Sequence, residues 1–186
     1  MDISLEEKKI LLRTARASIS SFFTKENKEI NLYPENILLN SRCGAFVTLT
    51  IARRLRGCVG FIISDEPLIE TVFKAARYAA FDDHRFSPLA QSELEKISIE
   101  ISVLSEPFPM NSYDDIIIGK HGLILEEKGR RGLLLPQVPV EHKMDRDGYL
   151  DAICEKTGLY AGYWKNKQLK INLFTADVFG ESEFEK

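Results

Sequence analysis

The fold of this chain is decided by two β-type runs, AFVTLTI at residues 45–51 and LRGCVGFII at residues 55–63. The first run alternates apolar residues with Thr48 and Thr50, which is the period of a half-buried strand. Only the short sequence Ala52-Arg53-Arg54 separates the runs. The two runs therefore predict a β-hairpin with a tight turn.

Helix and strand patterns lie on both sides of this hairpin. Residues 4–23 carry apolar residues at helical spacing after a capping-box pattern, so they predict a helix. A polar loop is predicted for residues 24–40. The sequence Asp65-Glu66-Pro67 is typical of a helix start, and the alternation over residues 97–103 predicts a strand.

The same order of elements recurs in the second half of the chain. A hairpin is predicted over residues 122–135, a helix over 147–156 and a strand over 169–178. The offset is about 75 residues, which places Arg131 opposite Arg56. The pattern indicates either an internal duplication or two unrelated α+β units of similar order.

The bulk composition is that of a globular protein. The chain has 186 residues, 44% of them hydrophobic and 28% charged, with a net charge of −3. This charge disfavours non-specific nucleic-acid binding. RNA binding is also disfavoured, because the sequence has no aromatic-rich basic motif. No apolar stretch approaches the roughly 20 residues of a membrane span. The N-terminus has no signal-peptide pattern, so a cytoplasmic protein is predicted.

The three cysteines, Cys43, Cys58 and Cys154, predict free thiols. They are odd in number, widely spaced and without a Cys-x-x-Cys pair, so neither a disulfide framework nor a zinc site is indicated. The sequence also lacks the glycine-rich nucleotide motifs and the His-Glu-x-x-His metal motif. We therefore predict no metal and no cofactor.

The segment Leu55-Arg56-Gly57-Cys58-Val59-Gly60 is the strongest functional signal. Glycine weakens a strand, and it commonly marks a bulge or a close backbone approach. Strand alternation predicts that Arg56, Cys58 and Gly60 share one face. A guanidinium beside a thiol favours the thiolate, and Gly60 leaves space beside the sulfur, so Cys58 is a candidate nucleophile.

Packing is the alternative role for these cysteines. A free cysteine is often buried as a small hydrophobic residue, and the glycines then matter for their conformation alone. Cys154 lies on a predicted helix near apolar residues, which favours a core position. Nothing in the sequence distinguishes Cys43.

The loop FDDHRFSP at residues 81–88 concentrates further chemistry. Its His84 is a candidate partner for a cysteine nucleophile, with a carboxylate such as Asp83 orienting the ring. The alternative is structural, with Asp82 or Asp83 shaping the turn and Arg85 pairing with a carboxylate.

A third cluster, LPQVPVEH, spans residues 135–142. Its two prolines predict a stiff, extended segment. Gln137 and Glu141 are candidate binding groups because they follow a predicted strand. The alternative is a rigid connection with exposed polar side chains.

Three segments together resemble one family. They are residues 44–49 leading to 55–60, residues 80–89 (AFDDHRFSPL) and residues 132–138 (GLLLPQV), and residues 154–159 with Trp164 fit as well. The chain resembles the AMMECR domain family, called protein A of the AmmeMemoRadiSam system in prokaryotes. The Leu-Arg-Gly-Cys-hydrophobic-Gly string is the signature of that family.

The resemblance implies the fold. It implies a single α+β domain over residues 1–186, with two duplicated hairpin–helix–strand units around one barrel-like, mainly antiparallel sheet. The lobes divide at about residue 106, as 1–106 and 107–186. The resemblance also implies a pathway shared with a Memo-type protein and a radical S-adenosylmethionine protein.

The resemblance also marks individual positions. The family pattern falls on Cys58 and Glu141 as candidate catalytic residues, and on a set of candidate substrate-binding residues. These are Arg56, Gly57, Gly60, Asp83, Arg85 and Gln137. Two positions depart from the pattern: His84 stands where the family usually has proline, and Met144 stands where tryptophan is common. A dyad of Cys58 and His84 is therefore not implied.

Two functions follow from these observations. The first is an enzyme or enzyme subunit with Cys58 as nucleophile or covalent acceptor, Arg56 as the group that binds an anion or favours the thiolate, and Glu141 or Asp83 as the proton carrier. The second is a binding or adaptor module that recognises a protein or a small ligand through the surface of residues 56–60, with Cys58 as a packing residue.

Overall fold

The computed structural model describes residues 3–24 and 35–184. Most of the loop predicted for residues 24–40 lies outside the described residues. The chain divides into two compact units. We call Asp2–Leu104 with Asp177–Lys186 the terminal unit, and Ser105–Ala176 the central unit. The chain enters the central unit after Leu104 and returns to the terminal unit at Asp177.

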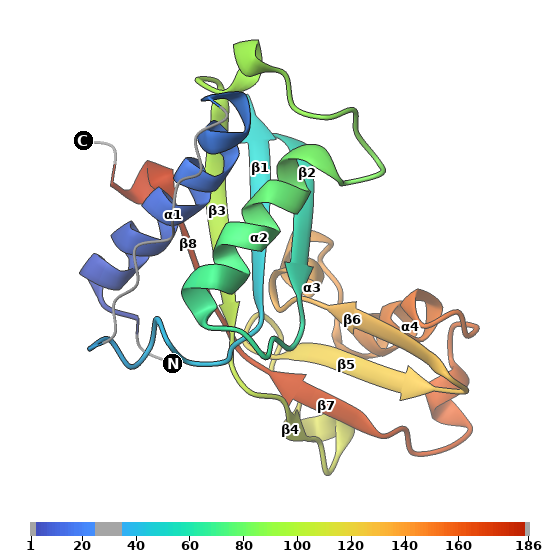
Figure 1. Cartoon of the computed structure of the whole chain (residues 1–186). Coiled ribbons are helices and arrows are strands. Elements are labelled where there is room, and N and C mark those ends of the chain that lie inside the picture. The colour runs from blue at the N-terminus through green and yellow to red at the C-terminus, as the bar shows by residue number, and fades with distance from the viewer. Residues whose placement is uncertain (1–2, 25–34, 185–186) are drawn as a thin grey trace. The chain divides into compact units, whose positions relative to one another are not determined.

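The terminal unit contains two helices and a four-stranded sheet in the order β2-β1-β3-β8. Strand β1 pairs antiparallel with both β2 and β3. Figure 1 shows α1 and α2 together on one face of this sheet. The elements are α1 (Leu5–Thr24), β1 (Ala45–Ile51), β2 (Arg54–Phe61), α2 (Leu68–Phe81), β3 (Ile97–Leu104) and β8 (Ala176–Gly180), with 3-10 turns at Gln91–Glu93 and Glu181–Glu183.

The alternation of the sequence sets the two faces of this sheet. Ala45, Val47 and Leu49 of β1 are fully buried in the same cluster as apolar residues of α1 and α2. Thr48 and Thr50 point to the opposite face, which we call the helix-free face. Burial of one face on two amphipathic helices gives the terminal unit its own core.

The central unit has a second four-stranded sheet, in the order β4-β7-β5-β6. Its pairings β4–β7, β5–β6 and β5–β7 are antiparallel. A separate buried cluster includes Leu123, Leu150 and Leu173. The elements are β4 (Phe108–Pro109), β5 (Gly122–Glu127), β6 (Arg130–Leu134), α3 (Gln137–Glu141), α4 (Arg146–Lys156) and β7 (Ile171–Phe174), with 3-10 turns at Tyr113–Asp115 and Tyr163–Lys165.

The two sheets repeat one strand order. A hairpin, a helix and a third strand give β2-β1-β3 in the terminal unit and β6-β5-β7 in the central unit. Gly57 pairs with Leu49 in the first hairpin, and Gly132 pairs with Leu125 in the second. This equivalence supports internal duplication over two unrelated units.

Three expectations need correction. The strands form two four-stranded sheets and not one barrel-like sheet, because each repeat closes around its own core. The strand expected over residues 169–178 is divided into β7 and β8, which belong to different sheets. The segment after β6 is the short helix α3 and not an extended chain, because Pro136 and Pro139 lie in the first turn, where proline is tolerated.

Among the described residues, no helix is both long enough and apolar enough to cross a membrane. The longest, α1, runs for 20 residues and carries charged side chains on its outer surface.

Candidate functional site

A β-bulge in the first hairpin decides where Cys58 points. Ala52 and Arg53 form the tight turn in left-handed conformations, with φ of 48° and 63°. The pairing then shifts by one residue, because Thr50 pairs with Leu55 whereas Leu49 pairs with Gly57. The residue between, Arg56, is the extra residue of the bulge.

The bulge places Cys58 on the helix-free face. With an uninterrupted register, Cys58 would lie opposite Val47, whose side chain is buried under the helices. The shift pairs Cys58 with Thr48 instead. The predicted common face therefore holds for Cys58 and Gly60 and not for Arg56, because side-chain alternation is broken at the bulge.

The two glycines of the segment lie where other backbone segments approach β2 closely. A Cβ added at Gly57 would lie 2.0 Å from the carbonyl oxygen of Ala79, so only glycine lets α2 approach β2 here. A Cβ added at Gly60 would lie 2.4 Å from the carbonyl oxygen of Ala45. Gly57 thus faces α2, and Gly60 lies beside β1.

The three thiols differ in their surroundings. Cys43 and Cys154 are buried, and burial raises the pKa of the Cys154 thiol above its ordinary value. Cys58 is half-buried, and the Thr48 hydroxyl donates a hydrogen bond to its sulfur over 3.3 Å. Cys58 is therefore the thiol with both a polar partner and partial access to solvent.

Two side chains hold the backbone of Cys58 at the outer edge of the sheet. Strand β2 is an edge strand, and the peptide groups of Cys58 point away from β1. The Cys58 N–H donates to Asp83 Oδ2 over 2.8 Å, and Arg85 Nη2 donates to the Cys58 carbonyl oxygen over 3.1 Å. We call this pair of contacts the Asp83–Arg85 clamp.

The clamp is a tight ion pair in its own right. Arg85 donates from Nε to Asp83 Oδ1 over 2.9 Å and from Nη2 to Asp83 Oδ2 over 2.7 Å. Arg85 therefore holds the pKa of the Asp83 carboxyl well below its ordinary value, although burial acts in the opposite direction. A carboxylate held ionised in this way is suited to a structural role and not to carrying protons near neutral pH.

The same ion pair also affects Arg85. The pKa of Arg85 is raised chiefly by Asp83, and the Cys58 side chain adds a smaller contribution in the same direction. The guanidinium also lies 5.5 Å from the centre of the Phe86 ring. Arg85 therefore lies next to Asp83, to the Phe86 ring and to Cys58.

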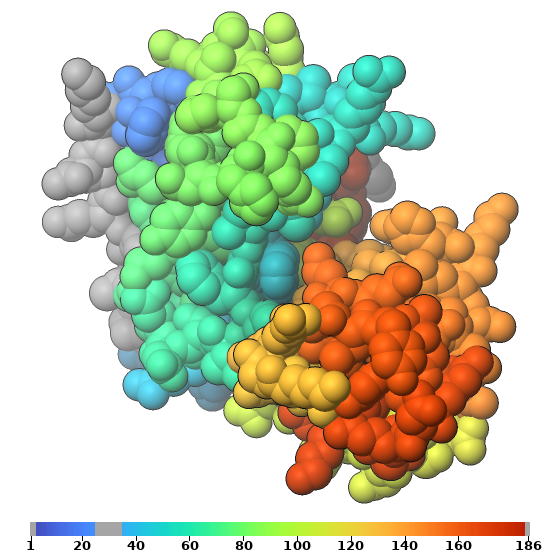
Figure 2. Space-filling model, turned by 90° about the vertical axis from the view of Figure 1, so that its right-hand side faces the viewer, coloured from blue at the N-terminus to red at the C-terminus, as the bar shows by residue number. Residues whose placement is uncertain are grey.

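Arg56 is held by a second ion pair. Its Nε and Nη2 donate to the two oxygens of Glu93 over 2.8 and 2.9 Å, and Nη1 donates to the carbonyl oxygen of Ser87 over 3.0 Å. Arg56 lowers the pKa of Glu93 to about 2. In Figure 2, the segment after α2 (green) lies directly beside the first hairpin (teal). Arg56 therefore fastens this segment to the bulge.

A hollow of about 410 Å³ lies on the helix-free face of the terminal unit, and Cys58 itself is not part of its lining. It begins at Thr48, the hydrogen-bond partner of Cys58, and extends over β1 and β3 toward Gly180. Hydroxyl groups of Thr48, Thr50, Ser98 and Ser182 contribute to its lining. The hollow is large enough for a small molecule.

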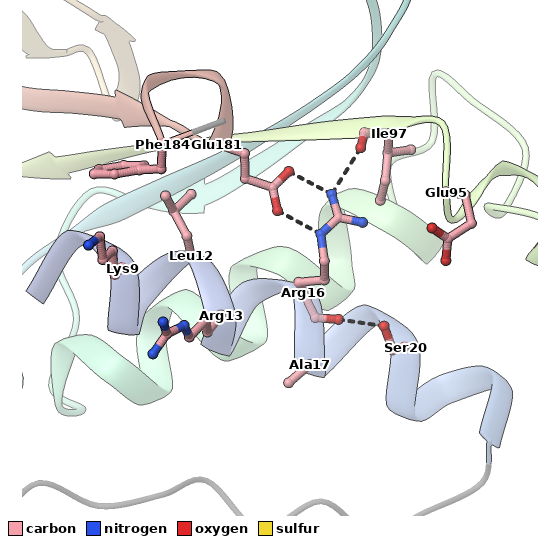
Figure 3. A pocket seen from close by; sticks show the side chains of 10 residues that line it. All are labelled: Lys9, Leu12, Arg13, Arg16, Ala17, Ser20, Glu95, Ile97, Glu181 and Phe184. Carbon is pink, nitrogen blue, oxygen red and sulfur yellow. Dashed lines mark hydrogen bonds and ion pairs between the residues drawn. The ribbon is translucent and has the colours of Figure 1, made fainter. Parts of the chain in front are cut away.

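A larger groove lies elsewhere in the terminal unit. It has a volume of about 710 Å³ and runs along α1 (Figure 3). Arg16 in its wall donates to both oxygens of Glu181 and to the carbonyl oxygen of Ile97. None of the predicted site residues lines it. We interpret its ion pair as a tie between α1 and the 3-10 turn after β8, with the hydrogen bond to Ile97 connecting α1 to the start of β3.

The remaining predicted residues lie outside this cluster. Gln137 and Glu141 belong to α3 of the central unit, and the Gln137 Oε1 atom is buried without a hydrogen-bond partner among the described residues. His84 is exposed between the two residues of the clamp. In the described part of the chain, no group of three or more potential ligands is arranged to hold a metal.

Two residues of the cluster were not predicted. Glu93 is separated from Arg56 by 37 positions, and no local pattern indicates their pairing. Thr48 belongs to a recognisable strand, but counting back from the turn places it opposite Gly57, because the sequence does not reveal the bulge. Both residues depend on tertiary structure.

The fold and the site define a class of protein: two α+β repeats, each with its own antiparallel sheet, and a half-buried edge-strand thiol. The chain belongs to the AMMECR1 family, whose model matches residues 12–179. The membership predicted from the resemblance is thereby confirmed.

Relatives cover almost the whole chain. Protein Ta0236 of Thermoplasma acidophilum is 38% identical over 190 residues, covering 98% of this chain and 91% of that protein. Protein MK0488 of Methanopyrus kandleri is 40% identical, covering 97% and 91%. The crystal structure of uncharacterized protein PH0010 from Pyrococcus horikoshii matches with a TM-score of 0.81 at 38% identity, covering 91% of this chain and 89% of that one. These names describe no activity.

Proposed function

We propose that this AMMECR1-family protein is an enzyme or enzyme subunit in which Cys58 acts as a nucleophile or covalent acceptor. The observation that carries the proposal is the position of its thiol. It is half-buried on the helix-free face, accepts a hydrogen bond from Thr48, and has a backbone held on its outer side by the Asp83–Arg85 clamp.

The arrangement suits nucleophilic chemistry. The reactive species of a cysteine nucleophile is the thiolate, and the Cys58 sulfur accepts a hydrogen bond from the Thr48 hydroxyl. The thiol proton passes to solvent or to a base of the protein. The sulfur then forms a bond to an electrophilic carbon of the substrate. The electron pair of the bond that breaks leaves with the leaving group. The hollow that begins at Thr48 is the proposed space for the substrate.

The other family positions have different parts in this proposal. Gly57 and Gly60 let the backbone elements approach, and Asp83 is a positioning residue because it fixes Cys58 and Arg85. Gln137 and Glu141 belong to α3 of the central unit, and we carry over their substrate-binding and proton-carrying roles from the family resemblance alone.

The pathway is part of the same proposal. The family resemblance favours a cytoplasmic protein that works with a Memo-type protein and a radical S-adenosylmethionine protein. Co-purification of these three proteins from one cell extract, compared with an extract of a Cys58→Ser strain, tests this association. Failure to recover either partner with the wild-type chain contradicts it.

Alkylation of the native protein tests the thiol. We expect iodoacetamide at pH 7 to modify Cys58 about tenfold or more faster than a short cysteine peptide, as the proposed role of a nucleophile requires. Mass spectrometry of the digested protein separates Cys58 from the buried Cys43 and Cys154, which serve as internal controls. Reaction of Cys58 at or below the rate of the peptide overturns the proposal.

A binding module is the competing function. It is favoured by the fact that Asp83, Arg56 and Glu93 are engaged in contacts within the chain, which makes the surface rigid. In that case Cys58→Ser preserves partner binding and bulky residues at Gly60 abolish it. Loss of function in a stably folded Cys58→Ser protein excludes the binding module.

A further inference from the structure

We propose that the Cys58 site takes a small carboxylate substrate and that Arg85 is the residue that anchors it. The inference rests on the proposed role of Cys58 and adds the chemical class of the substrate. It follows from the way in which the two guanidinium groups next to Cys58 use their hydrogen-bond donors.

Some hydrogen-bond donors of the Arg85 guanidinium are available to a ligand. A guanidinium has five N–H donors. In Arg85, Nε and Nη2 donate to Asp83 and to the Cys58 carbonyl oxygen, whereas Nη1 has no hydrogen-bond partner among the described residues. The side chain is 47% exposed, so solvent or a ligand reaches these remaining donors.

Arg56 shows the opposite arrangement. Its Nε, Nη1 and Nη2 atoms all donate to groups of the chain, namely Glu93, Ser87 and Pro88. Its side chain is 13% exposed. The anion-binding role that the sequence predicts for Arg56 therefore suits Arg85 better.

Arg85 is also fixed in place before any ligand binds. Asp83 grips it through two parallel hydrogen bonds, and the Phe86 ring lies beside its guanidinium. A bidentate pair of this kind restricts the long side chain, so less conformational entropy is lost on binding. The anchor is thus held next to the peptide group of Cys58.

The charge balance of the site selects the kind of anion. Asp83 already neutralises most of the positive charge of Arg85, so a doubly charged phosphate would be repelled by the neighbouring carboxylate. A single carboxylate needs only the Nη1 donors and gains a charge-assisted hydrogen bond. Because Arg85 bonds to the Cys58 carbonyl oxygen, the electrophilic carbon of such a substrate lies within a few bonds of its carboxylate.

Iodoacetate and iodoacetamide are the probes for this inference. They have the same size and the same reaction, in which the thiolate sulfur displaces iodide and forms a bond to carbon, and they differ in charge. We measure the ratio of the two rates at Cys58 in the full-length protein and in a cysteine peptide. We expect this ratio to be about tenfold higher in the protein, as one charge-assisted hydrogen bond provides.

Three variants locate the anchor. Arg85→Lys retains the cation and the ion pair with Asp83 but lacks the fork of donors, so the ratio falls toward that of the peptide. Arg85→Met removes both and brings the ratio to that of the peptide. Arg54→Gln is the matched control. It removes an exposed cation from β2, the strand that contains Cys58, and leaves the ratio unchanged.

The outcomes separate this inference from the proposed function. A wild-type ratio equal to or below that of the peptide, with Cys58 still reactive toward iodoacetamide, overturns the carboxylate site and leaves the nucleophile intact. A raised ratio that survives in a folded Arg85→Met protein assigns the anion to another cation and also overturns the inference. If Cys58 reacts with neither reagent faster than the peptide does, both proposals fail.

Discussion

Asp83 is the residue on which the geometry of the site depends most. Its side chain is 4% exposed, and its two oxygens accept hydrogen bonds from Arg85 and from the Cys58 N–H. A carboxylate in this position links the loop after α2 to the edge of the sheet. Its charge is essential to both contacts.

The first prediction concerns the contribution of Asp83 to the stability of the fold at neutral and at acidic pH. The folded pKa of Asp83 lies below the unfolded value of about 3.9, so the carboxylate stabilises the fold above that pH and the stabilisation is lost as the pH falls further. We expect Asp83→Asn to lower the free energy of unfolding by about 1–3 kcal/mol at pH 7 and by less at pH 3, where part of the stabilisation by the carboxylate is already lost. Urea unfolding at both pH values measures this difference.

The neighbouring residue provides the control for this experiment. Asp82 is exposed at the end of α2, so Asp82→Asn should change the free energy of unfolding little at either pH. An Asp83→Asn protein as stable as wild type at pH 7 would show that the clamp contributes nothing to stability.

At the scale of residues, part of the site is predictable. The sequence indicates Cys58 and the glycines because a glycine-rich strand is unusual, and it indicates Asp83 and Arg85 because charged residues gather in one loop. It does not indicate that Arg56 pairs with Glu93 and leaves Arg85 as the arginine next to the thiol. That outcome depends on one inserted residue in β2, which no local composition reveals.

At the scale of elements, the closest contact is between β2 and α2. The carbonyl oxygen of Ala79 occupies the space that a side chain at residue 57 needs. The equivalent Gly132 of β6 meets Thr157 at the end of α4, where an added Cβ would lie 2.4 Å from the Thr157 hydroxyl oxygen. Both repeats thus use a glycine in the second strand of the hairpin to bring the following helix close.

The second prediction follows from the short distance between α2 and β2 at Gly57. Gly57→Ala should lower the free energy of unfolding by about 1–3 kcal/mol or more, because backbone atoms must move to admit the methyl group. Gly180→Ala is the matched control, since its added Cβ meets its nearest atom at 3.4 Å and should cost little. Thermal and urea unfolding of the two variants give the comparison. Equal stability of both proteins would contradict the close approach.

Most elements are predictable because their periodicity is strong. The helix over residues 4–23 and the strand over 97–103 correspond closely to α1 and β3. The break between β7 and β8 is not predictable, because residues 169–178 read as one continuous run. The short helix α3 is also missed, since proline is compatible with an extended chain and with the first turn of a helix.

At the scale of the whole molecule, the two cores are separate. Leu49 is fully buried in the cluster of the terminal unit, and Leu150 is fully buried in that of the central unit. Repeats that close around their own cores are able to open separately. The predicted order of elements anticipates the duplication, but the pattern alone does not tell one shared sheet from two.

Hydrogen exchange tests the independence of the cores. Leu150→Ala should lower stability by about 2–5 kcal/mol and speed amide exchange in β5, β6 and α4, with little change in β1 and β3. Leu49→Ala is the matched variant and should give the reverse pattern. Equal acceleration in both units for either variant would show that the chain unfolds as one cooperative structure.

The Asp83–Arg85 clamp has a consequence for association between molecules. An edge strand with free N–H and C=O groups is a template for another chain, and strand-to-strand aggregation often begins there. At Cys58 two side chains occupy these groups, so a second strand finds no hydrogen-bonding partners at that point. Release of the clamp would uncover the N–H and C=O groups of Cys58, and the β2 edges of two molecules would then be free to pair.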